Sequence, residues 1–186
     1  MKTSPKTRPG FVEVPLLIVF INFTRYTAQA DRLDDLEVAR VLDRFYELCG
    51  SRVAAAGGRV VKVIGDGALF VFPADRADAG VLALLDLKQE ADRFMEEQGW
   101  ECRLLVKIHY GTVVEGQFGA GPEKRYDILG KAVNIAARLA GSGVVVSTEA
   151  FGQLGPAARR RFAKDAPPDT YILRGDVPRP RWSRGA

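Results

Sequence analysis

The fold is decided by residues 104–140, which read LLVKIHYGTVVEGQFGAGPEKRYDILGKAVNIAARLA. Apolar residues alternate with others in two runs, the first leading to Gly111 and the second to Gly116, and this alternation is typical of strands. A Gly-rich connection then leads to a short strand over 126–129. The spacing after that strand predicts a helix over 131–141.

The expected helix carries Asn134 and Arg138, which are four residues apart and therefore lie on one helical face. The opposite face is apolar, and the residues expected to pack there are Val133, Ala136, Ala137 and Ala140. Asp127 ends the strand before the helix. A carboxylate followed by an amide and a guanidinium on one face indicates a site for a polar, anionic ligand.

Length and composition favour one cytoplasmic domain. The chain has 186 residues, 47% of them hydrophobic, which suffices for one sizeable core. Cys49 and Cys102 lie in apolar stretches, so we expect buried, reduced thiols. The longest apolar run, 15–21, is too short to span a bilayer, so we expect no membrane segment. Residues 1–10 are expected to form a loose arm, and 177–186 a disordered tail.

The net charge is +4 and the pI is ≈ 9.2. Part of the basic excess lies in Arg159, Arg160 and Arg161, but no recognition motif or interleaved aromatic residues accompany it. We read this run as a solvated helix end and expect no nucleic-acid partner.

Upstream of the deciding stretch, apolar spacing indicates three longer elements. Residues 12–23 are β-branched and aromatic, with the density of a strand buried on both faces. From about 28 to 56, apolar residues recur at helical spacing. A second helix is expected over 74–98, opened by Pro73 and closed by Gly99.

Downstream, a short strand is expected over 144–146 and a last one over 171–173. A short helix begins at Ser147, and Gly155 with Pro156 is expected to end it. Strands and helices alternate, with hairpins among them. This pattern favours a mixed sheet covered by helices, an α+β layer fold.

Residues 60–64 and 68–72 read as two strands joined by Gly-Asp-Gly, a hairpin signature whose tip carries Asp66. The strand that ends with Asn22 and Phe23 is followed by a polar turn and a helix, which can present backbone N–H groups to phosphates. Because Mg²⁺ uses one or two carboxylates plus substrate oxygens, these parts can converge on a metal-bound triphosphate. Alone, the tripeptide is equally an ordinary turn.

Four stretches, in this order, resemble the catalytic domain of class III nucleotidyl (adenylate/guanylate) cyclases. They are LLIVFINFTRYT, VVKVIGDGALFVF, VKIHYGTVVEGQFG and YDILGKAVNIAARL, with VVVST after the last. The resemblance covers about residues 11–150, is weak over 151–176, and is most specific in the last stretch. It identifies residues 11–176 as a cyclase-homology domain.

The resemblance implies a ferredoxin-like α+β core, with helices packed on a mixed or antiparallel sheet, that works as a head-to-tail dimer. Active sites would lie between the chains, in a homodimer or in a heterodimer with another cyclase-type chain. The implied reaction is attack of the ribose 3′-oxygen of ATP on the α-phosphate, which yields 3′,5′-cyclic AMP and pyrophosphate. Mg²⁺ or Mn²⁺ would be the cofactor.

Roles carry over by position. Asp66 would bind the metal ion, Asn22 stands where the family has its other metal-binding Asp, and the Phe23 carbonyl would be a further ligand. Lys62 and Asp127 match the pair that reads the adenine edge. Plain structural readings stay open, since Lys62 also suits a surface strand and Asp127 suits a cap of the following helix.

The remaining matches concern the ribose and the phosphates. Asn134 would orient the ribose, and Arg138 would stabilise charge that grows on the α-phosphate, although it also suits an ion pair with a surface acid. Arg174 matches a phosphate-binding lysine. His109 matches a position beside the site, but we expect it to be a buried residue with a structural role.

Two departures from the family pattern bear on function. An amide at Asn22 cannot neutralise a dication, and loss of one ion would slow the reaction by roughly 10²- to 10⁴-fold. Leu105 stands where many members have a phosphate-binding Arg, and Arg103 and Lys107 on the same strand face are both candidates to replace it. Two functions therefore stay open: a weak adenylate cyclase, and a catalytically degenerate module that dimerises and binds nucleotide as a regulatory partner.

Overall fold

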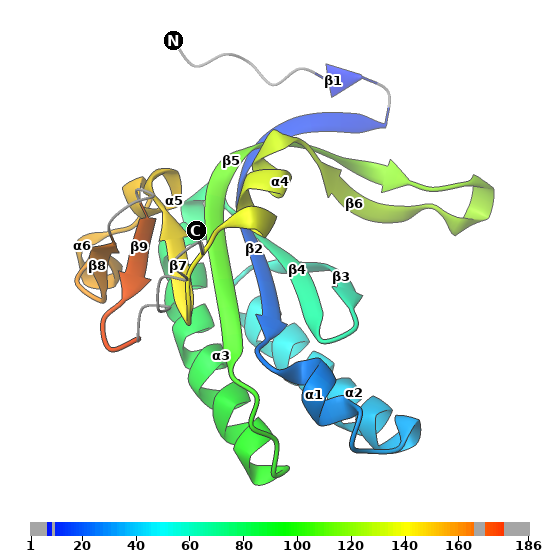
Figure 1. Cartoon of the computed structure of the whole chain (residues 1–186). Coiled ribbons are helices and arrows are strands. Elements are labelled where there is room, and N and C mark those ends of the chain that lie inside the picture. The colour runs from blue at the N-terminus through cyan, green and yellow to red at the C-terminus, as the bar shows by residue number, and fades with distance from the viewer. Residues whose placement is uncertain (1–6, 9, 166–169, 177–186) are drawn as a thin grey trace, which may run out of the picture.

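The computed structural model of the chain describes residues 7–8, 10–165 and 170–176 (Figure 1). Most of the expected arm over 1–10 and the whole expected tail over 177–186 lie outside the described residues. In the described part, nine strands form one sheet in the order β3-β4-β2-β5-β7-β9-β8, with β1 paired to β2 and β6 paired to β5.

The strands are β1 (Thr7–Arg8), β2 (Phe11–Phe23), β3 (Arg59–Ile64), β4 (Gly67–Pro73), β5 (Leu104–Phe118), β6 (Arg125–Leu129), β7 (Val144–Ser147), β8 (Phe162–Asp165) and β9 (Thr170–Leu173). The α-helices are α1 (Tyr26–Ala30), α2 (Asp35–Ala55), α3 (Ala77–Glu97), α4 (Lys131–Arg138), α5 (Thr148–Gly152) and α6 (Pro156–Arg159). Two short 3₁₀ turns are η1 (Ala74–Arg76) and η2 (Gly121–Glu123).

The long strands β2 and β5 form the centre of the sheet. They pair antiparallel from Phe11 opposite Gly116 to Phe23 opposite Leu104. β5 pairs parallel with β7, whereas its pairing with β6 is antiparallel. The sheet is therefore mixed and helices pack on it, which confirms the expected ferredoxin-like α+β fold.

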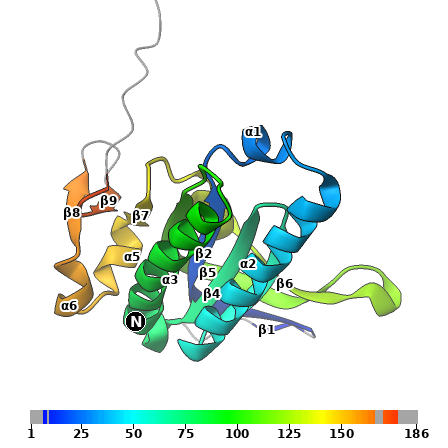
Figure 2. The ribbon, with the colours of Figure 1, turned by 90° about the horizontal axis from the view of Figure 1, so that it is seen from below.

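The two faces of the sheet are covered unequally (Figure 2). On one face, Leu17 of β2 shares a large core with Phe45 of α2 and Leu84 of α3. On the other face, Ile18 shares a smaller core with Ala136 of α4. Since α4 is much shorter than α2 and α3, it leaves part of this second face open to polar side chains.

β5 continues through Gly111, where the sequence pattern predicted the end of a run. A Cβ atom on Gly111 would lie 2.7 Å from the Cβ of Ala132 in α4. Real Cβ atoms do not approach so closely, so glycine is needed for α4 to sit on the strand. The prediction of a break at this glycine was wrong, because the residue marks a helix contact within one strand.

The single helix expected over 28–56 is two helices in the structure. Residues 31–34 separate α1 from α2, and the Asp34 side chain caps α2 by accepting a 2.9 Å hydrogen bond from the Glu37 N–H. An N-cap carboxylate satisfies a backbone donor that a continuous helix would bond internally. Leu36, which matched the helical spacing, is 60% exposed.

The C-terminal third also departs from the prediction. α4 ends at Arg138, its buried residues are Ala132 and Ala136, and Ala140 is exposed beyond its end. The short helix from Ser147 ends before Gly155, and Pro156 opens α6 because proline suits a first helical turn.

Two smaller findings complete the fold. β8 was not predicted, and it pairs with β9 at the edge of the sheet. Cys49 and Cys102 are buried and free, as expected, and burial raises the pKa of the Cys49 thiol to about 12. No described helix combines the length and the apolar character that crossing a membrane requires.

Candidate active site

The end of β2 and the tip of the β3–β4 hairpin border a pocket of about 340 Å³, here called the hairpin pocket. Its polar side chains are Asn22, Asp66 and Lys107, and Ala137 of α4 lines the same space. The structure therefore brings together two of the predicted metal ligands. It also adds a lysine that sequence alone left as one of two candidates.

Asp66 is fixed by the backbone around it. Its Oδ2 accepts a 3.0 Å hydrogen bond from the Phe23 N–H at the end of β2. The Tyr46 hydroxyl of α2 donates to the Gly65 carbonyl at 2.5 Å and so ties the hairpin tip to the helix layer. A Cβ on Gly67 would lie 2.7 Å from the Ile21 carbonyl, so glycine permits the hairpin to approach β2.

The oxygen donors here suit a hard divalent cation. Asp66 offers a carboxylate and Asn22 an amide oxygen to the pocket, and Mg²⁺ commonly combines such ligands with substrate oxygens. Phe23, whose carbonyl is the third predicted ligand, is the next residue in β2 but is not among those that line the pocket. The Asn22 Nδ2 lies 3.5 Å from the Phe23 carbonyl oxygen. The described residues contain no group of three or more His, Cys, Asp or Glu able to hold a metal. One carboxylate and neutral oxygen donors are ligand types that a divalent ion such as Mg²⁺ or Mn²⁺ accepts.

The structure distinguishes the two candidates for the missing phosphate-binding arginine. Lys107 lies opposite Phe20 in the pairing of β5 with β2, and its Nζ donates to the Ala137 carbonyl at 3.0 Å. Arg103 instead points toward the end of α3, where its guanidinium lies 3.7 Å from Glu96. Leu105, between them, is buried. Only Lys107 of this pair lines the hairpin pocket.

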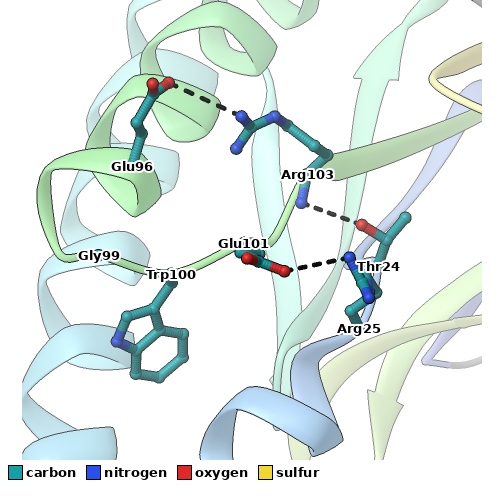
Figure 3. A pocket seen from close by; sticks show the side chains of 7 residues that line it. All are labelled: Thr24, Arg25, Glu96, Gly99, Trp100, Glu101 and Arg103. Atoms are coloured by element: carbon teal, nitrogen blue, oxygen red, sulfur yellow. Dashed lines mark hydrogen bonds and ion pairs between the residues drawn. The ribbon is translucent and has the colours of Figure 1, made fainter.

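Figure 3 shows the separate pocket that contains Arg103. In it, Arg103 and Glu96 face each other, while the Arg25 Nη1 lies 3.1 Å from the Glu101 Oε2. Both acids are paired with arginines, and all four of these side chains are largely exposed. Surface pairs of this kind contribute little to stability.

The Lys–Asp pocket, of about 430 Å³, lies between β3 and the β5–β6 ribbon. The Lys62 Nζ lies 2.5 Å from the Asp127 Oδ2 within it. Asp127 Oδ1 accepts from the Ile128 N–H at 2.8 Å, and the N-cap of α4 is Gly130 without a side-chain cap. The reading of Asp127 as a helix cap is therefore wrong. Lys62 is an exposed strand lysine, as its structural reading expected, and it is paired with Asp127.

Sequence reasoning missed two further residues of this pocket, Arg59 and Tyr126. The Arg59 guanidinium carbon lies 3.5 Å from the centre of the Tyr126 ring, a cation–π contact. The Tyr126 hydroxyl donates to Glu115 at 2.8 Å, and burial followed by this bond raises its pKa. The signal available in sequence was the position of Tyr126 directly before Asp127.

Asn134 and Arg138 are both exposed on α4. The Arg138 Nε donates to the Asn134 carbonyl at 3.1 Å, and its side chain lines a third pocket of about 350 Å³ that also includes Ser147 and Glu149. Arg138 is thus placed with neither the hairpin pocket nor the Lys–Asp pocket of its own chain. Within one chain, the predicted residues other than Arg174 therefore fall into three separate groups.

His109 is buried beside this third pocket. Its Nδ1 lies 2.8 Å from the Ser147 Oγ and 3.6 Å from the Glu149 Oε2. Burial lowers the pKa of the imidazole, and the nearby Glu149 carboxylate opposes that shift. The expected structural role of His109 is confirmed by these partners.

Arg174 follows β9 near the opposite edge of the sheet from the hairpin. Its Nε donates to the Arg160 carbonyl at 3.1 Å, and its N–H donates to the Arg161 carbonyl at 2.9 Å. It lines none of the pockets described above. The match of Arg174 to a phosphate-binding lysine stays a prediction.

Comparison with known proteins agrees with this fold. The family described as "Adenylate and Guanylate cyclase catalytic domain" matches residues 13–162. The chain therefore belongs to this family, and the resemblance to class III nucleotidyl cyclases is confirmed.

Two adenylate cyclases illustrate the relationship. The adenylate cyclase of Anabaena cylindrica is 28% identical over 134 residues, which cover 68% of this chain and 27% of the relative. Adenylate cyclase 2 of Rhizobium meliloti is 28% identical over 158 residues, or 78% of this chain and 43% of the relative. The chain thus spans less than half the length of these relatives.

Solved structures share the fold. A bacterial light-regulated adenylyl cyclase superposes with a TM-score of 0.77 at 22% identity, over 93% of this chain and 53% of that one. The adenylyl cyclase CyaB of P. aeruginosa gives 0.75 at 16% identity, over 92% of this chain and 97% of that one. At such identities the likeness concerns the fold alone.

Proposed function

We propose that the chain is a nucleotidyl cyclase that converts ATP to 3′,5′-cyclic AMP and pyrophosphate, at sites shared by two chains packed head to tail. The observation that carries this proposal is the Lys62–Asp127 pair, whose polar atoms lie 2.5 Å apart in an open pocket. Family membership supplies the reaction class, and this pair supplies the choice of base.

The chemistry of the pair favours adenine. An ammonium can donate to the N1 acceptor of adenine, and a carboxylate can accept from its N6 amino group. Guanine presents a donor at N1 and an acceptor at O6, which is the reverse arrangement. A buried polar group left without its partner is costly, so this pair should discriminate against guanine.

The hairpin pocket would hold the metal and the triphosphate. Asp66, the Asn22 amide and the Phe23 carbonyl are the residues proposed to bind a divalent ion. When bound, the ion would offset the negative charge of the phosphates and favour ionisation of the 3′-hydroxyl. Because Asn22 carries no charge, we propose that the reaction is slow.

The second chain would supply the groups that the first lacks at this pocket. Asn134 would orient the ribose, and Arg138 would stabilise charge on the α-phosphate, as charge-assisted donors do in phosphoryl transfer. Two observations support an interchain site: within one chain Arg138 lines a different pocket from Asp66, and both α4 side chains are exposed. Arg174 would be a further phosphate ligand. ATP as substrate and two buried free thiols favour a cytoplasmic location.

Product analysis tests the proposal. The protein is incubated with ATP, GTP, CTP or UTP, with Mg²⁺ or Mn²⁺, at several protein concentrations. We expect cyclic AMP from ATP, at a rate per chain that rises with concentration as dimers form. A different cyclic nucleotide as main product would overturn the base assignment.

The neutral Asn22 also favours a second candidate function, a degenerate module that dimerises and binds ATP as a regulatory partner. It predicts ATP binding without product from any triphosphate. Activity that appears only when a second cyclase-type chain is added would indicate the heterodimeric form of this function.

A further inference from the structure

The hairpin pocket contains an unusual balance of charge for a site proposed to bind metal. Of the side chains that line it, Asp66 is the acid and Lys107 is the base. Asn22 occupies the position at which a second carboxylate would raise the negative charge. One carboxylate and one ammonium leave the pocket formally neutral.

The position of Lys107 follows from the register of the central strands. Asn22 lies opposite Leu105, so Lys107 is the diagonal neighbour of Asn22 on the same face of the sheet. Diagonal neighbours are roughly 7–8 Å apart at their Cα atoms, within reach of a long side chain. A shift of one residue would have sent Lys107 to the opposite face.

The ammonium is also anchored at its far end. Its hydrogen bond to the Ala137 carbonyl, at 3.0 Å, lies in the last turn of α4. Carbonyls there lack helical partners and carry partial negative charge, which favours a cation. Lys107 is thus held over the hairpin pocket by α4 itself, the helix that carries Asn134 and Arg138.

We propose that Lys107 is a fixed cation that takes the place of a second divalent ion beside the phosphates. Each site then binds a single divalent ion. This inference rests on the proposed function of the site. A second dication would meet one carboxylate fewer and an ammonium nearby, and both changes disfavour it. The triphosphate, in contrast, gains a charged donor from Lys107.

The metal count is tested with Mn²⁺ and 3′-deoxy-ATP, which lacks the attacking oxygen and so cannot cyclise. Electron paramagnetic resonance counts bound Mn²⁺ per bound nucleotide. We expect one for the wild-type chain, and two for the double variant Asn22→Asp, Lys107→Met, which restores the carboxylate and removes the cation. Two bound ions in the wild-type chain would overturn the proposal.

The phosphate contact is tested by calorimetry on single variants. Lys107→Met should bind 3′-deoxy-ATP about tenfold more weakly, as expected for loss of one charged hydrogen bond, with unchanged affinity for 3′-deoxyadenosine. Lys107→Arg should recover most of the loss. Arg103→Met is the matched control, since this cation directly before β5 lines a different pocket, and it should behave as wild type. Equal behaviour of Lys107→Met and Arg103→Met would contradict the inference.

These readouts differ from the test of the reaction. A chain that binds one Mn²⁺ with 3′-deoxy-ATP and forms no cyclic AMP from ATP would uphold the role of Lys107 and end the enzyme proposal. A chain that forms cyclic AMP and binds two ions would support the enzyme proposal and overturn the proposed role of Lys107. Thermal unfolding of each variant verifies that a loss of binding is not a loss of fold.

Discussion

The hairpin pocket and the Lys–Asp pocket differ in how far each keeps the residues that its proposed task needs. In the Lys–Asp pocket, Lys62 and Asp127 are both present and in contact. In the hairpin pocket, Asp66 is fixed by the Phe23 N–H, but its proposed partner ligand is the neutral Asn22 and a lysine lines the same space. The pair proposed to read the base is thus complete, whereas the pair proposed to bind the metal contains one neutral member.

Such a difference is informative because the two tasks tolerate change unequally. Base recognition depends on matched donors and acceptors, and one wrong partner leaves a polar group unsatisfied. Charge neutralisation is less specific, since an ammonium can take over part of what a metal ion does. A chain can therefore lose one metal ligand and still bind nucleotide.

The largest expected effect comes from breaking each side of the proposed interchain site in turn. Arg138→Ala and Asp66→Ala should each lower activity by about 10³-fold. The first removes the cation proposed to stabilise the transition state, and the second removes the carboxylate proposed to bind the metal. An equal mixture should recover about a quarter of the wild-type rate, since half the dimers are hybrids with one intact site of two.

Cyclic AMP formation and sedimentation measure activity and dimer content in the same samples. Arg103→Ala serves as the charge-removal control and should keep full activity. A mixture as inactive as its components, with dimers present, would argue that Asp66 and Arg138 do not act across the interface.

The second prediction concerns a substitution that adds a carboxylate to the hairpin pocket. Asn22→Asp should raise the rate of cyclic AMP formation by about 10²-fold with Mn²⁺, because it restores a negative ligand for the metal. Steady-state rates at saturating ATP provide the measurement. An unchanged rate, with ATP binding and fold intact, would show that Asn22 is not at the metal and would remove the asymmetry between the two pockets.

These two pockets also show what the sequence could and could not predict. Asp66, Asp127, Asn134 and Arg138 lie in short local patterns, so turn and helix spacing were enough to single them out. Lys62 was selected by the resemblance to the cyclase family. The choice between Arg103 and Lys107 depends on the pairing of β5 with β2, which joins residues some 80 apart in the chain. No local pattern carries that information.

The errors in the fold have the same origin. Gly111 looked like a strand end, but its small size serves a contact with Ala132 of α4. The break before α2 depends on the Asp34 cap, which apolar spacing ignores. β8 has four residues and lies at the edge of the sheet, next to β9. So short a segment shows too little apolar alternation to be predicted as a strand.

The third prediction concerns base recognition in the Lys–Asp pocket. ATP should stabilise the protein against thermal unfolding more than GTP, by up to ~2.7 kcal/mol for ATP at a hundredfold excess over its Kd. Lys62→Met and Asp127→Asn should reduce this difference, because each removes one of the two groups that distinguish the bases. Scanning fluorimetry with the four triphosphates measures it. Equal protection by all four would withdraw the base-reading role of Lys62 and Asp127.

The smallest expected effect concerns His109, which lies on β5 between Lys107 and the segment that pairs with β6. Burial lowers its pKa from the ordinary value of 6.5, so the unfolded chain binds a proton more readily than the folded chain. The contribution of neutral His109 to folding stability is therefore complete above pH 6.5 and is lost as the pH falls through the lowered pKa of the folded chain.

Denaturant unfolding from pH 8 to pH 5 should show this loss, and His109→Gln should flatten it. Because β5 supports both pockets, loss of fold through His109 must weaken both alike. A pH change that weakens metal binding and spares base selection therefore has its origin in the hairpin pocket itself. If His109→Gln leaves the slope of stability against pH unchanged, other groups carry the acid sensitivity of the fold.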